Sequence, residues 1–147
     1  MADILLMAGI QETRKKIYAA LTEAEGLQAW WSQHSDIKPE VGSLATISFY
    51  GGMMEFKLRV TELEAGSKVV WAVEGGPPDW DGTTITWTLS DGEGQSMVHF
   101  AHAVFTSTDG EFAGYNFNWA WYLISLKFYL EKGEGMPHTD ADKMPGM

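Results

Sequence analysis

The order of two hydrophobic patterns constrains this fold more than any other feature of the sequence. Several short segments alternate between apolar and polar residues, which is typical of strands with one buried face. They are followed by a long segment, residues 109–133, that is apolar on nearly every side and ends at Gly133, a residue type common just after a helix. Short turns between successive strands predict antiparallel neighbours. We therefore expect an α+β domain in which a curved antiparallel sheet packs around a long C-terminal helix.

The residues before this helix predict the other elements. Residues 3–10 have the pattern of a first strand, and residues 12–21 have helical spacing. The segment from Thr22 to Glu25 resembles a capping box, which predicts a second short helix ending near Trp31. Further strands are predicted over residues 43–49, 54–60, 68–73, 84–89 and 96–105.

The chain is expected to form a single domain over residues 1–133. Residues 134–147 lack periodicity and are predicted to be a disordered tail. His138, Asp140 and Asp142 lie in this tail and carry metal-binding groups. Ordering such a segment around an ion would cost conformational entropy, so no metal site and no cofactor are predicted.

Charge and composition exclude several classes of function. The formal net charge of -10 disfavours nucleic acids and anionic membranes as partners. The absence of cysteine excludes disulfides, thiolate catalysis and cysteine-based zinc sites. The N-terminal residues do not have the pattern of a signal peptide, and no apolar stretch is long enough to span a bilayer, so a cytoplasmic protein with no membrane span is expected.

One stripe of the long helix should face the sheet. Helical spacing of 100° per residue places six apolar residues on this stripe: Phe112, Tyr115, Trp119, Leu123, Leu126 and Leu130. The strands would present Phe49, Phe56, Trp71, Trp87 and Phe100 to them. These aromatic side chains either fill an ordinary core or line a cavity for a small apolar ligand, and the sequence leaves both interpretations open.

His102 is the one ionisable side chain on an otherwise apolar strand face. It is either a buried, hydrogen-bonded structural histidine or a polar anchor or general acid/base in the cavity. In the ligand-binding interpretation, the cavity is lined by Phe49, Phe56, Trp71, Trp87, Phe100, His102, Tyr115, Trp119 and Leu123. Trp30, Trp31 and Trp80 would lie near its entrance.

Two other features of the sequence suggest possible sites. Phe117, Trp121, Ile124 and Phe128 form a second apolar stripe on the other side of the long helix, which predicts a homodimer or partner interface. The segment 32–36 contains Ser, His and Asp, but closeness in sequence does not make a catalytic triad, and this segment is interpreted as a polar loop.

Several segments resemble one family. The segment from Ala19 to Trp31, with its Leu-Thr-Glu-Ala-Glu and Trp-Trp elements, is similar to the Hsp90-ATPase-activator-homologue (AHSA1-like) group of the START-like, SRPBCC superfamily. The segments 41–43, 98–102 and 119–133 resemble further motifs of that group, in the same order. One departure is Val104, which stands where the group often has glycine.

The resemblance implies a helix-grip fold with a deep hydrophobic cavity. Relatives bind lipids, hormones or polyketides, and some are cyclases or aromatase-like enzymes. The sequence therefore predicts a protein that binds a small apolar molecule in an aromatic cavity. The alternatives are a cyclase or hydratase that uses His102, or a stress-linked, co-chaperone-like interaction module. In the co-chaperones of this group the domain accompanies a separate Hsp90-binding domain, for which 147 residues leave no room.

Overall fold

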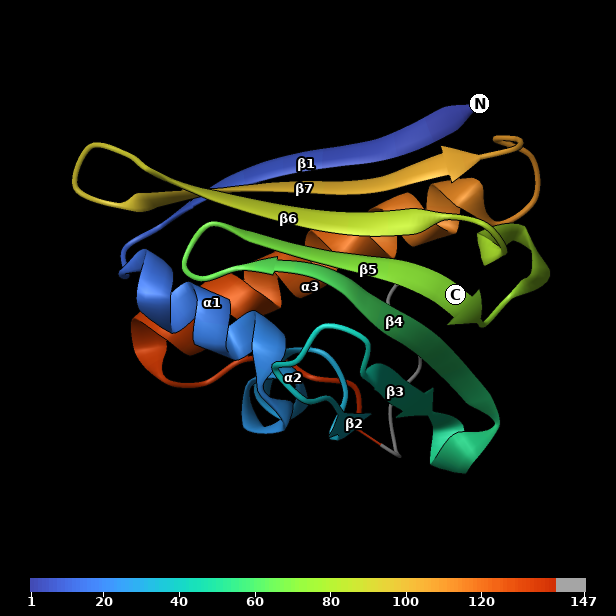
Figure 1. Ribbon diagram of the computed structural model, residues 1–147, viewed down its shortest axis with the longest axis horizontal. Helices are drawn as coiled ribbons and strands as arrows, with labels where there is room; N and C mark the ends of the chain where they lie inside the picture. The colour runs from blue at the N-terminus through green and yellow to red at the C-terminus, as the bar shows by residue number, and fades with distance from the viewer. Residues whose placement is uncertain (140–147) are drawn as a thin grey trace.

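The computed structural model describes residues 1–139, and in this part of the chain seven antiparallel strands form one sheet in the order β1-β7-β6-β5-β4-β3-β2 (Figure 1). The strands are β1 (Ala2–Ile10), β2 (His34–Asp36), β3 (Leu44–Phe49), β4 (Met54–Glu64), β5 (Lys68–Gly75), β6 (Thr84–Asp91) and β7 (Ser96–Phe105). The helices are α1 (Arg14–Thr22), α2 (Ala24–Trp30) and α3 (Phe112–Lys132), with short 3-10 segments η1 (Tyr50–Gly52) and η2 (Pro78–Trp80). The predicted α+β architecture is confirmed.

Helix α3 lies across one face of the sheet, and α1 and α2 pack beside it (Figure 1). The alternation that predicted the strands matches the observed burial: Phe56, Leu58 and Val60 of β4 point into the core. On α3, the stripe predicted to face the sheet is buried at Tyr115, Trp119, Leu123 and Leu126, while Phe112 and Leu130 are half-buried. Hydrophobic burial on both layers therefore accounts for the way α3 covers the sheet.

The junction between α1 and α2 differs from the prediction. Thr22 is the last residue of α1, and its hydroxyl donates to the Tyr18 carbonyl at 2.9 Å instead of capping α2. Only Glu23 lies between the two helices, so Thr22 still belongs to the last turn of α1. Its hydroxyl therefore bonds to a carbonyl one turn earlier in the same helix. The Trp30 indole N–H donates to the Ala20 carbonyl at 2.9 Å, and Gly26 allows close contact with Ala20. The predicted capping box is therefore wrong, although both helices exist.

Two segments without a predicted structure pair with the rest of the domain. Residues 34–36, interpreted as loop, form the edge strand β2, in which His34 pairs with Ser48 and Ser35 with Ile47. The pairing is possible because a short edge strand can be polar on its exposed side.

Residues 134–139, part of the predicted tail, make backbone contacts with the domain. The backbone N–H of His138 donates to the Trp31 carbonyl at 2.8 Å, and its carbonyl accepts from Gln33 at 3.1 Å. Gly135 packs against the backbone oxygens of Ala29 and Ser125, a contact too close for a larger residue. These backbone contacts order a segment whose sequence has no periodicity. Asp140 and Asp142 lie outside the described residues.

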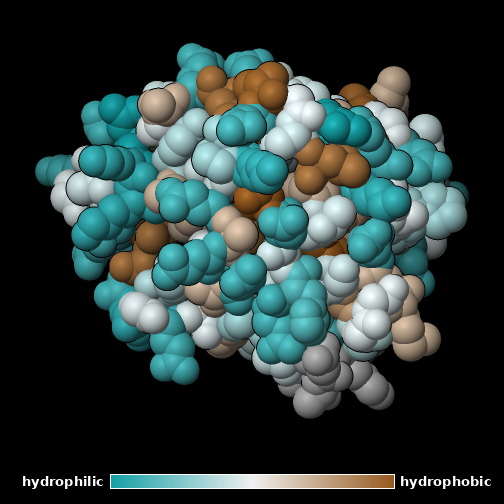
Figure 2. Space-filling view, turned by 60° about the horizontal axis from the view of Figure 1, so that its bottom comes forward, coloured by the Kyte–Doolittle hydropathy of each residue, from teal (hydrophilic) through white to brown (hydrophobic). Residues whose placement is uncertain are grey.

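The surface in Figure 2 shows hydrophobic residues as separate patches within a largely hydrophilic surface. Within residues 1–139, none of the helices has both the length and the apolar composition needed to cross a bilayer.

Candidate functional site

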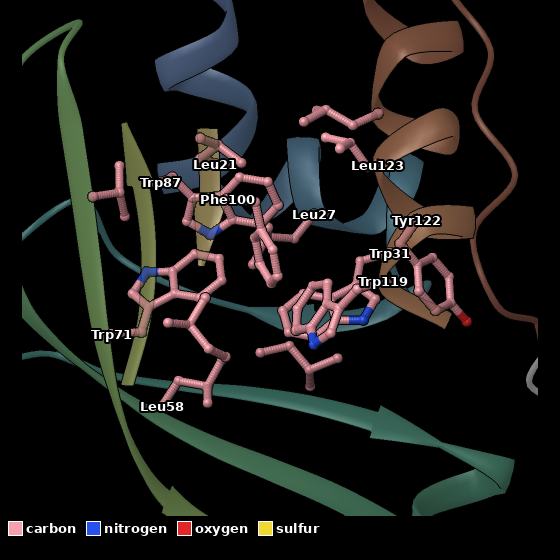
Figure 3. Close-up of a cluster of buried hydrophobic side chains, with 14 of the residues drawn as sticks. Leu21, Leu27, Trp31, Leu58, Trp71, Trp87, Phe100, Trp119, Tyr122 and Leu123 are labelled. Carbon is pink, nitrogen blue, oxygen red and sulfur yellow. The ribbon is translucent and has the colours of Figure 1, made fainter. Parts of the chain in front are cut away.

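Aromatic side chains fill the centre of the domain. Trp31 stacks between Trp30 and Trp71, with ring centroids 5.6 and 5.9 Å away and rings 10° apart in each pair. Trp87 contacts Trp71, and Phe100 stands edge-on to Trp87 at 4.7 Å. Figure 3 shows Trp31, Trp71, Trp87 and Trp119 together filling the space between the sheet and α3. The centre of the predicted cavity is therefore occupied by the protein's own side chains.

A small pocket remains at one end of this core, between β4, η2 and α3. Its volume is about 20 Å³. A single water needs roughly 10–15 Å³ of such space, whereas pockets for drug-sized ligands have on the order of 300–1,000 Å³. The lining consists of Trp31, Met54, Phe56, Pro77, Trp80, Tyr115, Asn118, Trp119 and Tyr122.

The structure brings only some of the predicted site residues to this pocket. Phe56, Tyr115 and Trp119 line it as predicted for cavity residues. Trp31 and Trp80, predicted near an entrance, belong to its wall and are almost fully buried. The other predicted residues, Phe49, Trp71, Trp87, Phe100, His102, Leu123 and Trp30, are buried in the core and do not line the pocket. For Trp30 the reason is that its indole turns back onto α1 to bond Ala20.

Four lining residues were missed from the sequence. Asn118 and Tyr122 follow Tyr115 at helical spacing on α3, so the period of the helix could have identified them. Met54 and Pro77 lie at or beside turns, where no periodic pattern marks which way a side chain points.

Trp80 occupies the pocket end of the core. Its ring stacks on Phe56 with centroids 4.4 Å apart and rings 29° apart. Trp119 stacks on the Trp80 ring at a centroid distance of 6.2 Å and an angle of 21°, and the rings of His102 and Tyr115 stand edge-on to it at 4.5 and 5.6 Å. No charged side chain belongs to the pocket lining. The pocket therefore suits an uncharged, flat, apolar group, because a buried charge without a partner would be costly.

Two side-chain contacts hold the η2 loop against the domain. The Tyr115 hydroxyl donates to Asp79 Oδ1 at 2.8 Å, which joins the start of α3 to η2. Burial and this carboxylate raise the pKa of the Tyr115 phenol well above its usual range, so it stays protonated. The Thr83 hydroxyl donates to the Trp80 carbonyl and closes the loop on its other side.

His102 is a structural link in this region. The Trp119 indole N–H donates to His102 Nδ1 at 3.1 Å, so in the neutral ring Nε2 carries the hydrogen and donates to Thr83 Oγ1 at 2.8 Å. Burial lowers the pKa of His102 to about 3. Both ring nitrogens thus bond to protein groups and the ring is neutral at physiological pH, which is unfavourable for general acid/base chemistry.

The second stripe of α3 faces outward. Phe117, Trp121 and Ile124 are 55%, 38% and 46% exposed. Phe128 is half-buried, and the ammonium of Lys132 lies 4.6 Å from the centre of its ring. The outward direction of the stripe agrees with the prediction, while its role as an interface stays a prediction. Among the described residues, no group of His, Asp and Glu is arranged to hold a metal ion.

The curved antiparallel sheet with α3 across it and α1 and α2 beside it is the helix-grip fold of START-like proteins. Residues 11–131 match the family described as "Activator of Hsp90 ATPase homolog 1-like protein", and the chain belongs to this family. No curated protein shows a significant match.

Solved structures agree with this assignment. The Aha1 dimer from Colwellia psychrerythraea is 37% identical, with a TM-score of 0.84, and the match covers 92% of this chain and 100% of that one. An AHSA1-like protein from Aeromonas hydrophila is 17% identical, with a TM-score of 0.73 and 90% and 94% coverage. A Staphylococcus saprophyticus protein is 20% identical, with a TM-score of 0.78 and 94% and 98% coverage. The last two support the fold alone.

Proposed function

We propose that this protein binds a small, uncharged, apolar molecule in the pocket between β4, η2 and α3. The observation that carries the proposal is the pocket wall, which is built largely of aromatic rings and contains no charged side chain. A site of this kind, with few polar groups among apolar ones, is the usual form of a small-molecule site. No cofactor is needed for such binding.

The pocket must open for a ligand to enter, because its present volume of about 20 Å³ is too small. Its outer wall includes Met54, at the start of β4 beside η1, and Pro77, beside η2. These segments are short turns rather than the middle of strands, and such connections open more readily than paired backbone. The ligand would therefore enter through a wall of the core that is formed partly by turns.

The test uses a neutral fluorescent probe, N-phenyl-1-naphthylamine, after native mass spectrometry and denaturing extraction have identified any compound that co-purifies. We expect saturable probe binding to the unaltered protein. Met54→Trp, which fills the pocket, should weaken it by about tenfold or more, corresponding to about 1.4 kcal/mol. Met53→Trp is the matched control, because the neighbouring Met53 is exposed and does not line the pocket. Absence of saturable binding, or equal effects of the two substitutions, would contradict the proposal.

We do not assign a cyclase or hydratase reaction to His102, because both of its nitrogens are engaged by Trp119 and Thr83. A second function is supported by a different observation, the exposed side chains of Phe117, Trp121 and Ile124 on α3. We propose that this stripe, with Phe128 at its end, forms the contact between two copies of the chain. The Colwellia psychrerythraea structure, 37% identical, is described as a dimer, which supports dimer formation by this chain.

Sedimentation velocity tests the dimer. The unaltered protein should sediment as a dimer at micromolar concentration, and Trp121→Glu should convert it to a monomer by placing a charge in an apolar contact. Asn116→Glu, an exposed position on the same helix but outside the stripe, serves as the control and should leave the dimer intact. A monomeric unaltered protein, or a dimer that survives Trp121→Glu, would argue against this interface and favour the stripe as a contact for another protein.

A further inference from the structure

Trp80 differs from the other buried tryptophans in the backbone that carries it. Trp30 belongs to α2, Trp71 to β5, Trp87 to β6 and Trp119 to α3, and Trp31 directly follows α2, where its backbone N–H bonds to the Leu27 carbonyl. Trp80 instead ends the three-residue segment η2, in the connection between β5 and β6. Its ring nevertheless reaches inward and stacks on Phe56 and Trp119.

Contacts with other rings fix the Trp80 side chain in place: besides Phe56 and Trp119, the rings of His102 and Tyr115 stand edge-on to it at 4.5 and 5.6 Å. Within the loop, the Trp80 N–H bonds to the Pro77 carbonyl and the Thr83 N–H to the Trp80 carbonyl. The Tyr115–Asp79 bond described above and a bond from the Val73 N–H to the Thr83 carbonyl join the loop to α3 and β5. Gly76 and Gly82 flank it with φ of 147° and 76°, conformations that glycine adopts without strain, and small residues beside a loop are positions where a hinge can lie.

The indole N–H of Trp80 adds nothing to this anchoring. It is buried, and it finds no hydrogen-bond acceptor among residues 1–139. Trp71 and Trp87 share this property within the described residues, whereas the N–H groups of Trp30 and Trp119 bond to the Ala20 carbonyl and to His102. The Trp80 ring is therefore kept in the pocket by ring contacts, which another flat aromatic ring could also make.

We infer that the side chain of Trp80 occupies the ligand site when no ligand is bound. A flat, uncharged aromatic molecule about the size of an indole takes its place between Phe56 and Trp119, and the η2 loop turns Trp80 outward. This inference rests on the proposed function. It explains how a pocket of about 20 Å³ serves as a binding site, because a cavity with the shape of an indole ring forms when the Trp80 ring moves out. Because the ligand replaces the indole ring of Trp80, the ligand must resemble that ring in size, flatness and lack of charge.

The experiment uses indole as the probe and protein labelled with 5-fluorotryptophan, with the Trp80 resonance assigned from Trp80→Phe. We expect indole to bind the unaltered protein saturably and to move the Trp80 fluorine resonance to a solvent-exposed position. Cyclohexanol, which is not flat, should do neither. Trp80→Ala should bind indole about tenfold more tightly or better, because the internal competitor is gone and the competent state is always populated.

A cavity made by removing any buried tryptophan could bind indole, so the decisive protein is the unaltered one. Trp87→Ala serves as the comparison, since Trp87 belongs to strand β6 and its resonance should not move in the unaltered protein when indole binds. Thermal unfolding establishes that both alanine variants are folded before binding is measured.

The outcomes separate this inference from the proposed function. If the unaltered protein binds indole or the naphthylamine probe while the Trp80 resonance stays buried, the displacement of Trp80 is refuted and the pocket proposal stands. If only Trp80→Ala binds indole, Trp80 is a fixed core residue and the inference is again refuted. If neither the unaltered protein nor folded Trp80→Ala binds any of the probes, the proposed function fails as well.

Discussion

The two ends of the aromatic core contain the same residue type but hold it differently. At the closed end, Trp30, Trp71 and Trp87 stand on α2, β5 and β6. The backbone hydrogen bonds of these elements hold the three residues in position. At the pocket end, Trp80 stands on a short loop between two glycines. The same side chain can thus be permanent core or a movable part of a site.

This difference shows that burial alone does not separate core from site. Trp80 and Trp87 are both nearly inaccessible to solvent. What distinguishes them is the cost of moving their backbone, which is high within a paired strand and low in a loop.

Removing a tryptophan from the closed end should have the largest effect. Trp87→Ala is expected to lower the free energy of unfolding by about 3–5 kcal/mol, because β6 cannot move to fill the cavity. Trp80→Ala should cost less, about 2 kcal/mol, since the η2 loop can settle into the space left by the ring. Urea unfolding followed by circular dichroism measures both. Equal losses would remove the basis for treating the two ends as different.

Acid should weaken the link between the two layers at His102. The side chain has a pKa of about 3 in the folded protein and about 6.5 when unfolded. As the pH falls below 6.5, the unfolded chain takes up a proton that the folded protein excludes, so stability decreases. We expect a loss of about 2–3 kcal/mol between pH 6.5 and pH 4.5 from this group.

The measurement is urea unfolding at a series of pH values. His102→Asn should be less stable at neutral pH but should lack this part of the pH dependence. His99→Asn, on the exposed side of the same strand, should keep it. If the free energy of unfolding depends on pH in the same way for His102→Asn and the unaltered protein, His102 is not a buried neutral group in the folded protein.

Val104 stores strain near the pocket end. It stands at the end of β7 with φ of 64°, a left-handed conformation that is a genuine outlier for a β-branched residue. Glycine, which the resemblance to the family implies at this position, would adopt this conformation without strain. Val104→Gly is expected to raise the free energy of unfolding by about 1 kcal/mol, measured by urea unfolding, because relief of strain exceeds the entropy cost of glycine. Val104→Ala, which keeps a Cβ, should gain less; an equal gain would point to side-chain contacts rather than backbone strain.

The smallest effect is expected from the contact between Tyr115 and Asp79. Tyr115→Phe removes the hydroxyl that joins α3 to the η2 loop and should cost about 0.5–1 kcal/mol. Hydrogen exchange of the backbone amides of residues 79–83 should become faster, while amides of β6 should keep their protection. Unchanged exchange in the loop would mean that this contact does not restrain Trp80.

The fold could be predicted from the sequence to a large extent. In β4 and β6, apolar and polar residues alternate with the two-residue period of a strand, and in α3 apolar residues recur with the period of a helix. These periods decide which side chains share a face, and the shared face is the buried one. Two elements were missed, β2 and the segment around His138, because both are short and neither has the apolar alternation or helical spacing from which the other elements were predicted. The Thr22 cap was wrong because two helices lie only one residue apart, which a local motif cannot reveal.

The site was only partly predictable for a related reason. Helical spacing placed Tyr115 and Trp119 correctly and could have added Asn118, whereas Met54 and Pro77 depend on the path of turns. By itself, the sequence determined the strand and helix pattern, the family, and the set of aromatic residues that must be buried. The tertiary structure was needed to show that these rings fill the centre of the domain and leave a small pocket beside Trp80. The free volume between a sheet and a helix depends on how side chains pack in three dimensions, and spacing along the chain does not specify it.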